Sequence, residues 1–272
     1  MGKLAVIMSL YKNDRLEYVK LAVESILDQT YRDFDYYIQY DGPVLSEIDE
    51  YLLALTDQRL KIHKRAENKG LAYSLNELLQ KVMPLGYEYI ARMDADDISM
   101  PDRFEKQFAF LETHKDIDCL GGAINEIDEN GDDRNKITVY PCNPDDARIF
   151  FRKRNPVAHP TVMMRRRIFA KAGGYYPMDF ERNEDTMLWY KAYIGGAKIA
   201  NLPDIILNFR MTEAMFTQRR NGKEFAKKQL EMRKIINKDL QFGTIANWYA
   251  YAMYVLMISP VWMLKLAYRI LR

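Results

Sequence analysis

The sequence predicts an α/β protein in which helices cover both faces of a mostly parallel sheet. Short apolar segments alternate with segments of helical periodicity through residues 4–93, which is the pattern of βαβ units. The chain has 272 residues and 48% of them are hydrophobic, enough for one large core. Its two cysteines, Cys119 and Cys142, belong to no CxxC or Cys/His cluster. A zinc knuckle or disulfide scaffold is therefore excluded, and a cytosolic location is expected.

Strands and helices are expected in strict alternation. Leu4 to Met8 is a short apolar run that predicts a strand, and apolar residues recur at helical spacing from Leu16 to Gln29. The other expected elements are a strand over 34–39, a helix over 45–55, a strand over 60–63, a helix over 71–82, a strand over 87–93 and a helix that begins near Pro101. Sheets of this kind bind ligands outside the carboxyl ends of their strands.

Polar and small residues follow the predicted strands at that edge. They are Ser9, Tyr11, Asp41, Arg65, Asn68, Gly70, Asp94, Ala95, Asp96 and Asp97. This set combines an aromatic ring, several carboxylates and a basic group. It suits a nucleotide whose diphosphate is bound through a metal ion.

The first strand is not followed by a glycine-rich phosphate loop, so the charge of a diphosphate must be met in another way. Asp94 and Asp96, at i and i+2 after a strand, can both reach one divalent cation that bridges diphosphate oxygens. Mn²⁺ and Mg²⁺ both suit such oxygen ligands. The alternative is that Asp97 caps the helix near Pro101 and the other two carboxylates are solvated.

In these residues the sequence resembles the family 2 glycosyltransferases, nucleotide-sugar enzymes of the GT-A fold, over most of residues 3–215. Seven segments carry the resemblance in the family's order: 6–11, 25–31, 40–42, 68–72 with Asn76, 93–97 with 101–103, 173–175, and 183–185 with Leu188 and Trp189. The resemblance implies a nucleotide-sugar-binding half over 1–100 and an acceptor-binding half over 101–215. Tyr40 stands where the family has the first acid of an Asp-Asp pair.

The resemblance also implies roles for single residues on the donor side. Ser9, Tyr11 and Asp41 would form the nucleoside pocket, Asp41 at the base edge. The loop with Arg65, Asn68 and Gly70 would contribute to the same pocket. Asp94 would lie by the ribose and the metal, Asp96 would ligate the metal directly, and Ala95 and Asp97 would line the donor site.

On the acceptor side the candidates are Glu184 and Asp185. Displacing a nucleoside diphosphate from an anomeric carbon requires a deprotonated hydroxyl, and one carboxylate can act as the base. Asp185 is the expected base, and a single displacement inverts the anomeric centre. The alternative is an ordinary acidic first helical turn, favoured by the helix dipole. His159 is a third candidate metal ligand, with a structural histidine as its alternative.

The C-terminal part, residues 216–272, differs from the rest in charge and hydropathy. It holds eleven basic and three acidic residues, a net charge of +8, which leaves −6 on residues 1–215 of a chain whose total is +2. Residues 244–264 carry no charge and include several Tyr and Trp. One spanning helix or two interfacial helices hinged at Pro260 fit this stretch. A buried core helix or a dimer interface is the alternative.

Together these features predict a metal-dependent, inverting glycosyltransferase. Its donor would be a UDP-hexose or UDP-N-acetylhexosamine, and its acceptor a saccharide on polyprenyl diphosphate in bacterial capsule, exopolysaccharide or O-antigen synthesis. Residues 216–272 would bind the cytoplasmic face of the bacterial inner membrane, and no nucleic-acid partner is expected. The alternatives are a sugar-nucleotide pyrophosphorylase or phosphohydrolase, and a catalytically inactive membrane-binding module.

Overall fold

The computed structural model describes residues 4–180, 182–212, 223–260 and 263. In these ranges the strands are β1 (Leu4–Leu10), β2 (Phe34–Tyr40), β3 (Leu60–His63), β4 (Tyr89–Arg92), β5 (Ile98–Ser99), β6 (Cys119–Ile127), β7 (Asp133–Thr138), β8 (Met163–Arg165) and β9 (Ile199–Arg210). The helices are α1 (Leu16–Leu27), α2 (Ser46–Ala54), α3 (Leu71–Val82), α4 (Arg103–Thr113), α5 (Pro144–Phe150), α6 (Arg167–Lys171), α7 (Glu184–Ile194), α8 (Lys223–Asp239) and α9 (Gly243–Ile258), with 3₁₀ turns η1 (Met83–Leu85) and η2 (His159–Thr161).

One sheet runs through the described residues in the order β3-β2-β1-β4-β8-β6-β9-β5, and β7 pairs with β6. The first four of these strands are parallel, as predicted. The second half makes the sheet mixed instead of mostly parallel, because β8 is antiparallel to both β4 and β6 while β6 and β9 pair in parallel. β7 also follows β6 after only a short turn, and so short a connection allows only antiparallel pairing.

The core lies on both faces of this sheet. Successive residues of β1 alternate between two apolar clusters, Leu4, Val6 and Met8 facing one and Ala5 and Ile7 the other. The first cluster includes the buried faces of α1, α2 and α4, and the second those of α3, α6 and α7. A strand buried on both sides needs apolar residues at every position, which is why β1 reads as a continuous apolar run.

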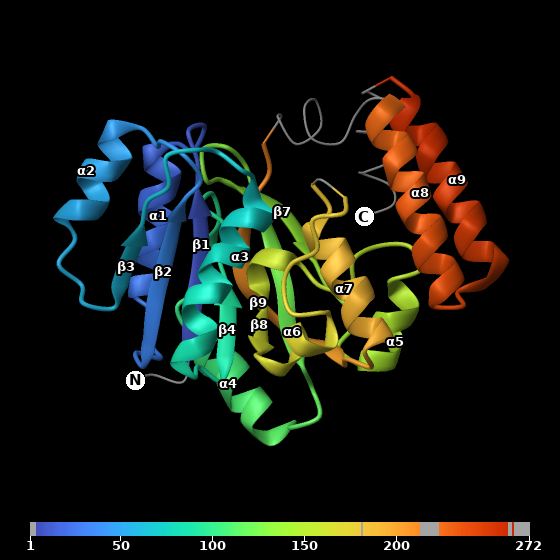
Figure 1. The fold of residues 1–272 in the computed structure, drawn as a ribbon, viewed down its shortest axis with the longest axis horizontal. Coiled ribbons are helices and arrows are strands. Elements are labelled where there is room, and N and C mark those ends of the chain that lie inside the picture. Colours follow the sequence, from blue (N-terminus) through green and yellow to red (C-terminus); the bar gives the residue numbers. More distant parts are fainter. Residues whose placement is uncertain (1–3, 181, 213–222, 261–262, 264–272) are drawn as a thin grey trace.

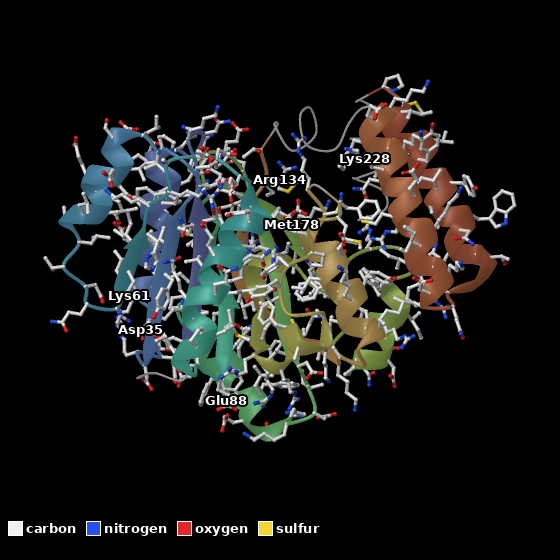
Figure 2. The ribbon with its side chains drawn as sticks, in the orientation of Figure 1. Asp35, Lys61, Glu88, Arg134, Met178 and Lys228 are labelled. Atoms are coloured by element: carbon white, nitrogen blue, oxygen red, sulfur yellow. The ribbon has the colours of Figure 1, made fainter. Side chains whose placement is uncertain are left out.

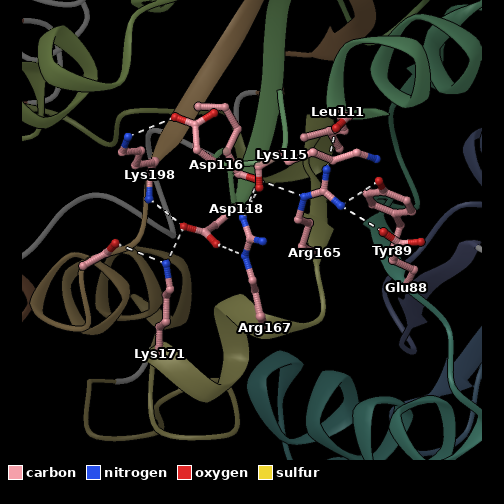
Figure 3. Close-up of polar contacts among 12 residues, drawn as sticks. Glu88, Tyr89, Leu111, Lys115, Asp116, Asp118, Arg165, Arg167, Lys171 and Lys198 are labelled. Atoms are coloured by element: carbon pink, nitrogen blue, oxygen red, sulfur yellow. Dashed lines mark hydrogen bonds and ion pairs between the residues drawn. The ribbon is translucent and has the colours of Figure 1, made fainter. Parts of the chain in front are cut away.

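Ion pairs stabilise the outer edge of the sheet and the start of β6. Asp35 of β2 and Lys61 of β3 lie together at the outer edge (Figure 2), with Lys61 Nζ 2.9 Å from Asp35 Oδ1. At the start of β6 the buried Asp118 accepts hydrogen bonds from Arg167 at 2.5 Å and Lys171 at 2.8 Å (Figure 3). These pairs lie away from the carboxyl ends of β1, β2 and β4, so we assign them a structural role.

Two predicted boundaries move in the structure. β1 continues to Leu10, so Ser9 lies on the strand instead of after it. The helix expected near Pro101 is α4, which begins at Arg103 with Asp102 at its N-cap position. Asp97 therefore does not cap this helix.

The C-terminal helices α8 and α9 form an antiparallel pair at the end of the molecule opposite α2 (Figure 1). Within the described residues no helix is both long enough and apolar enough to cross a membrane. α9 ends at Ile258, just before Pro260. The second of the two expected interfacial helices falls on residues 261–272, which apart from Met263 lie outside the described residues.

Candidate active site

The nucleoside side of the site is built where β1 and β2 end. The Asp41 N–H donates to the Leu10 carbonyl at 2.6 Å, which holds the two strand ends together. The buried Asp41 carboxylate accepts hydrogen bonds from the N–H groups of Lys69 at 2.7 Å and Gly70 at 2.9 Å. Asn68 donates to the Asp41 carbonyl at 3.1 Å. The strand end and the 68–70 loop thus form one unit.

Glycine is required next to Asp41. Gly42 has a φ of +80°, and a Cβ there would lie 2.8 Å from the backbone nitrogen of Asn68. The strand end and the loop can approach this closely only without a side chain. Tyr40, the departure from the family pattern, is buried and donates its hydroxyl to Asp49 of α2 at 3.0 Å, which is a structural role.

Arg65 holds the Asp41 side chain in place. Its guanidinium contacts the Asp41 and Glu77 carboxylates and donates to the Ser74 hydroxyl at 3.0 Å. A fourth donation, at 2.7 Å, goes to the Glu67 carbonyl. With these contacts made, Arg65 orients Asp41. A contribution of Arg65 to the nucleotide site stays a prediction.

The loop after β4 brings Asp94, Asp96 and Asp97 together. Each offers a carboxylate oxygen, and the three oxygens all lie within 4.8 Å of one another. Arg210 at the end of β9 holds this loop, because its backbone N–H donates to Asp97 Oδ1 and its Nε to the Asp96 carbonyl, both at 2.8 Å. Arg210 was not predicted from the sequence.

The environment of Asp97 fits a divalent cation. The residue is buried, and its Oδ2 has no hydrogen-bond partner among the described residues. Burial, with repulsion from Asp96 and Asp94, raises the pKa of the Asp97 carboxyl well above its ordinary value. An all-oxygen site with one unsatisfied buried carboxylate oxygen suits Mn²⁺ or Mg²⁺. Asp94, Asp96 and Asp97 are therefore the residues that could hold it.

Arg92, the last residue of β4, joins this cluster to the acceptor side. It is 3% exposed, and its Nη1 donates to Asp94 Oδ2 at 2.7 Å. Burial alone disfavours its charge, but Asp94, Tyr176 and Glu184 together raise the pKa of Arg92. The sequence analysis missed Arg92. A single charged residue at the end of the buried run Tyr89-Ile90-Ala91 is the signal that could have found it.

Glu184 and Asp185 begin α7, and Glu184 lies close enough to Arg92 to affect its charge. The Asp185 carboxylate is held in place, because Oδ2 accepts from Asn155 Nδ2 at 2.8 Å and Oδ1 from the Thr186 N–H at 2.6 Å. Burial and the neighbouring Asp185 raise the pKa of Glu184 to about 7. An oriented carboxylate beside one that titrates near neutrality can accept a proton from a hydroxyl.

The structure does not bring His159 into the metal cluster. Among the described residues that cluster contains the three aspartates without His159. His159 is buried, with Nε2 3.1 Å from the Tyr176 hydroxyl and its ring against the edge of Trp189. Burial, with repulsion from Arg92, lowers the pKa of His159 well below its ordinary value. These contacts correspond to the structural alternative for this histidine.

The other predicted donor-site residues lie around the same edge. Ser9 is half-buried on β1, and Tyr11 follows the strand half-buried with its N–H bonded to Asp14 Oδ2 at 2.7 Å. Ala95 is buried inside the aspartate loop. β1, β2 and β4 are neighbours in the sheet, so the nucleoside side and the aspartate cluster share one edge.

Similarity to known proteins agrees with this geometry. A model of glycosyl transferase family 2 matches residues 5–173. This chain is a family 2 glycosyltransferase. The transferase is 32% identical to the amylovoran biosynthesis glycosyltransferase AmsE of Erwinia amylovora over 232 residues, covering 85% of this chain and 84% of AmsE.

The name of a second relative states the substrates of that enzyme. The transferase is 27% identical over 228 residues to an Escherichia coli β-1,3-galactosyltransferase named for UDP-Gal and α-D-GlcNAc-diphosphoundecaprenol, covering 82% of this chain and 79% of that one. A solved structure, S. aureus TarS 1–349 in complex with UDP-GlcNAc, matches 99% of this chain and 73% of its own with a TM-score of 0.65. At 17% identity this match shows a common GT-A-like fold.

Proposed function

We propose that the transferase moves a sugar from a UDP-hexose or UDP-N-acetylhexosamine to a hydroxyl of a saccharide carried on a polyprenyl diphosphate, in bacterial cell-surface polysaccharide synthesis. One observation carries the proposal: an aspartate cluster that could hold a cation and an oriented acidic pair both lie within electrostatic reach of the buried Arg92. AmsE, named for amylovoran biosynthesis, supports the pathway. The E. coli relative, named for a diphosphoundecaprenol acceptor, supports the lipid carrier.

The donor side binds the nucleotide sugar. Asp41, held by the 68–70 loop and Arg65, offers its carboxylate to the base edge, and Ser9 and Tyr11 complete the nucleoside pocket. Asp94, Asp96 and Asp97 hold the cation. When bound, Mn²⁺ or Mg²⁺ supplies charge neutralisation of the departing diphosphate.

On the acceptor side, Asp185 removes the proton of the attacking hydroxyl. Asn155 and Thr186 fix its carboxylate, so the base needs little reorganisation before it accepts the proton. Attack opposite the leaving group inverts the anomeric centre, so an α-linked donor gives a β-linked product. The E. coli relative, a β-1,3-transferase by name, supports this outcome.

Release of nucleoside diphosphate tests the proposal. We expect release from a UDP-sugar that requires both a divalent cation and a lipid-diphosphate saccharide. Release without an acceptor would favour the phosphohydrolase alternative. A folded protein that releases nothing with any UDP-sugar would overturn the proposal and favour an inactive module.

A pair of variants tests the base. Asp185→Asn should lower turnover about a hundredfold or more and leave nucleotide binding near wild type. Asp146→Asn is the matched control, because Asp146 is an exposed acid in the first turn of α5. Equal activity of the two variants would show that Asp185 is only an acid of a first helical turn.

We place the enzyme at the cytoplasmic face of the inner membrane, because a polyprenyl-linked acceptor is confined to a bilayer. Residues 216–272 are the region that would attach it there.

A further inference from the structure

α9 turns its large apolar side chains outward. Ile245 is 78% exposed, Trp248 75% and Val255 59%, and Tyr251 and Ile258 are also exposed. These positions recur at the spacing of one helical face. The small Ala246 and Ala250 are buried on the opposite face. A helix of a water-soluble pair normally buries its large residues, so this face is built to contact something else.

Cations border this face. α9 carries no charged residue, whereas α8 carries six basic and three acidic residues, a net charge of +3. Lys234 reaches across from α8, with Nζ 4.8 Å from the centre of the Tyr251 ring. Lys223, Lys227, Lys228 (labelled in Figure 2), Lys234 and Lys238 are all exposed. The surface thus combines apolar and aromatic side chains with lysines.

We propose that this α9 face and the lysines of α8 form a docking surface for an anionic lipid bilayer, on which α9 lies in the interface. Trp and Tyr prefer the level of the headgroups, aliphatic residues enter the acyl boundary, and lysines attract anionic headgroups. A second copy of the chain fits less well, because symmetric pairing of these faces would bring the same lysines together.

The antiparallel pair of α8 and α9 also fixes the position of the active site relative to that bilayer. Gln229 of α8 donates to Asn183 Oδ1 at 2.5 Å, and Asn183 is the N-cap residue of α7. Arg233 donates to the Phe151 carbonyl at 3.0 Å. The docking surface is therefore attached to the helix that begins with Glu184 and Asp185, so lipid binding would place the acidic pair at a set orientation to the membrane.

This inference deepens the proposed function, but its test does not depend on turnover. Full-length protein is floated with vesicles of phosphatidylcholine alone or with phosphatidylglycerol added. We expect binding to the anionic vesicles, lowered about tenfold or more by Trp248→Glu and by Ile245→Glu. Lys227→Glu combined with Lys234→Glu should also weaken it. Leu53→Glu is the matched control, since Leu53 is also apolar and is 62% exposed but lies on α2.

The inference would be overturned if the folded wild-type protein did not bind anionic vesicles, or if the Trp248→Glu variant bound them like wild type. It would also be overturned if light scattering showed a dimer that Trp248→Glu converts to a monomer. The last would assign the face to a second copy. Nucleoside diphosphate release with saturating detergent-solubilised acceptor is measured in parallel. Intact vesicle binding without release would refute the proposed function alone, and release without vesicle binding would refute the docking surface alone.

Discussion

Three arginines, of which Arg92 and Arg210 are buried, fix the carboxylates at the ends of the central strands. Arg65 supports Asp41, Arg92 pairs with Asp94, and Arg210 holds the loop of Asp96 and Asp97. A guanidinium stays charged at any relevant pH and presents several fixed donors. Each carboxylate is therefore oriented before a ligand arrives, which suits electrostatic stabilisation of a reacting diphosphate.

Glu184 gives a prediction about stability and pH. Burial, followed by repulsion from Asp185, raises its pKa to about 7, above the value of about 4.3 expected in the unfolded chain. Its contribution to stability is fully present below pH about 4 and is lost as the pH rises through about 7, because the unfolded chain releases the proton first. Glu184→Gln should remove this loss, on the order of 4 kcal/mol at most.

Urea unfolding of the metal-free protein at several pH values between about 4 and 8 measures this effect. Glu105→Gln is the control, because Glu105 occupies the first turn of α4 at an exposed position. If Glu184→Gln kept the wild-type decline in stability between those pH values, Glu184 would not be the titrating group.

At the scale of elements, β6 joins the two halves of the sheet. It pairs with β7, β8 and β9, and its first residue follows the buried Asp118. Asp118 binds Arg167 and Lys171 of α6 and accepts from the Lys198 N–H at 2.8 Å (Figure 3). This network connects β6, α6 and the start of β9 without reaching the active site.

Asp118→Asn should therefore lower stability and leave chemistry intact. Although burial alone raises its pKa, the pairs with Lys171 and Arg167 dominate and lower the pKa of Asp118 below its ordinary value. Its contribution is present above pH about 4 and is lost as the pH falls. We expect the variant to lose about 2 kcal/mol in urea unfolding at neutral pH, with unchanged KM for the donor. Asp116→Asn, at an exposed pair with Lys198, is the control; an equal loss there would contradict the burial argument.

The close packing around Gly121 of β6 leads to a second prediction about stability. A Cβ there would lie 2.1 Å from Val157 Cγ2 and 2.6 Å from Asn201 Oδ1. Gly121→Ala should therefore lower the free energy of unfolding by about 1 to 3 kcal/mol through overpacking. Val157→Ala in the same chain should restore part of this loss, because it removes the nearest methyl group. A double variant less stable than the two single effects combined would contradict this contact as the cause.

The elements also show what the sequence can predict. β1 and β4 can be predicted because strands buried on both faces are continuous apolar runs. The half-buried β3 lacks such a run and is predicted from its place between two helical segments. β7 is a mostly exposed polar strand, and β9 contains Pro203 and Asp204 where its register with β6 shifts, so neither carries that signal. In the site, motif spacing identified the aspartates. Arg92 and Arg210 were not predicted, because the interaction of Arg92 with Glu184 and the bonds of Arg210 to the aspartate loop join segments that meet only in the fold.

At the scale of the whole molecule, charge is divided unevenly along the chain, and the charged part of the basic C-terminal segment that the structure describes is α8, with a net charge of +3. Residues 1–215 carry −6 and residues 216–272 carry +8. The hairpin of α8 and α9 lies at the end of the molecule opposite α2 (Figure 1). An anionic bilayer would attract this end and repel the acidic body. The charge distribution thus favours one orientation on a membrane, in which the bilayer contacts the hairpin.

The lysines of α8 predict that vesicle binding depends on salt concentration, while donor binding depends on it less. Each lysine near an anionic surface contributes about 1 kcal/mol, and the Debye length shortens to about 3 Å at about 1 M salt. Raising NaCl from about 0.05 to about 0.5 M should therefore weaken binding to phosphatidylglycerol vesicles by about tenfold or more. The thermal shift produced by UDP with Mn²⁺ should change little, because the Asp94, Asp96 and Asp97 cluster is partly or fully buried and poorly screened. Salt-independent flotation would show that the apolar face of α9 alone holds the membrane and that the lysines of α8 contribute nothing to orientation.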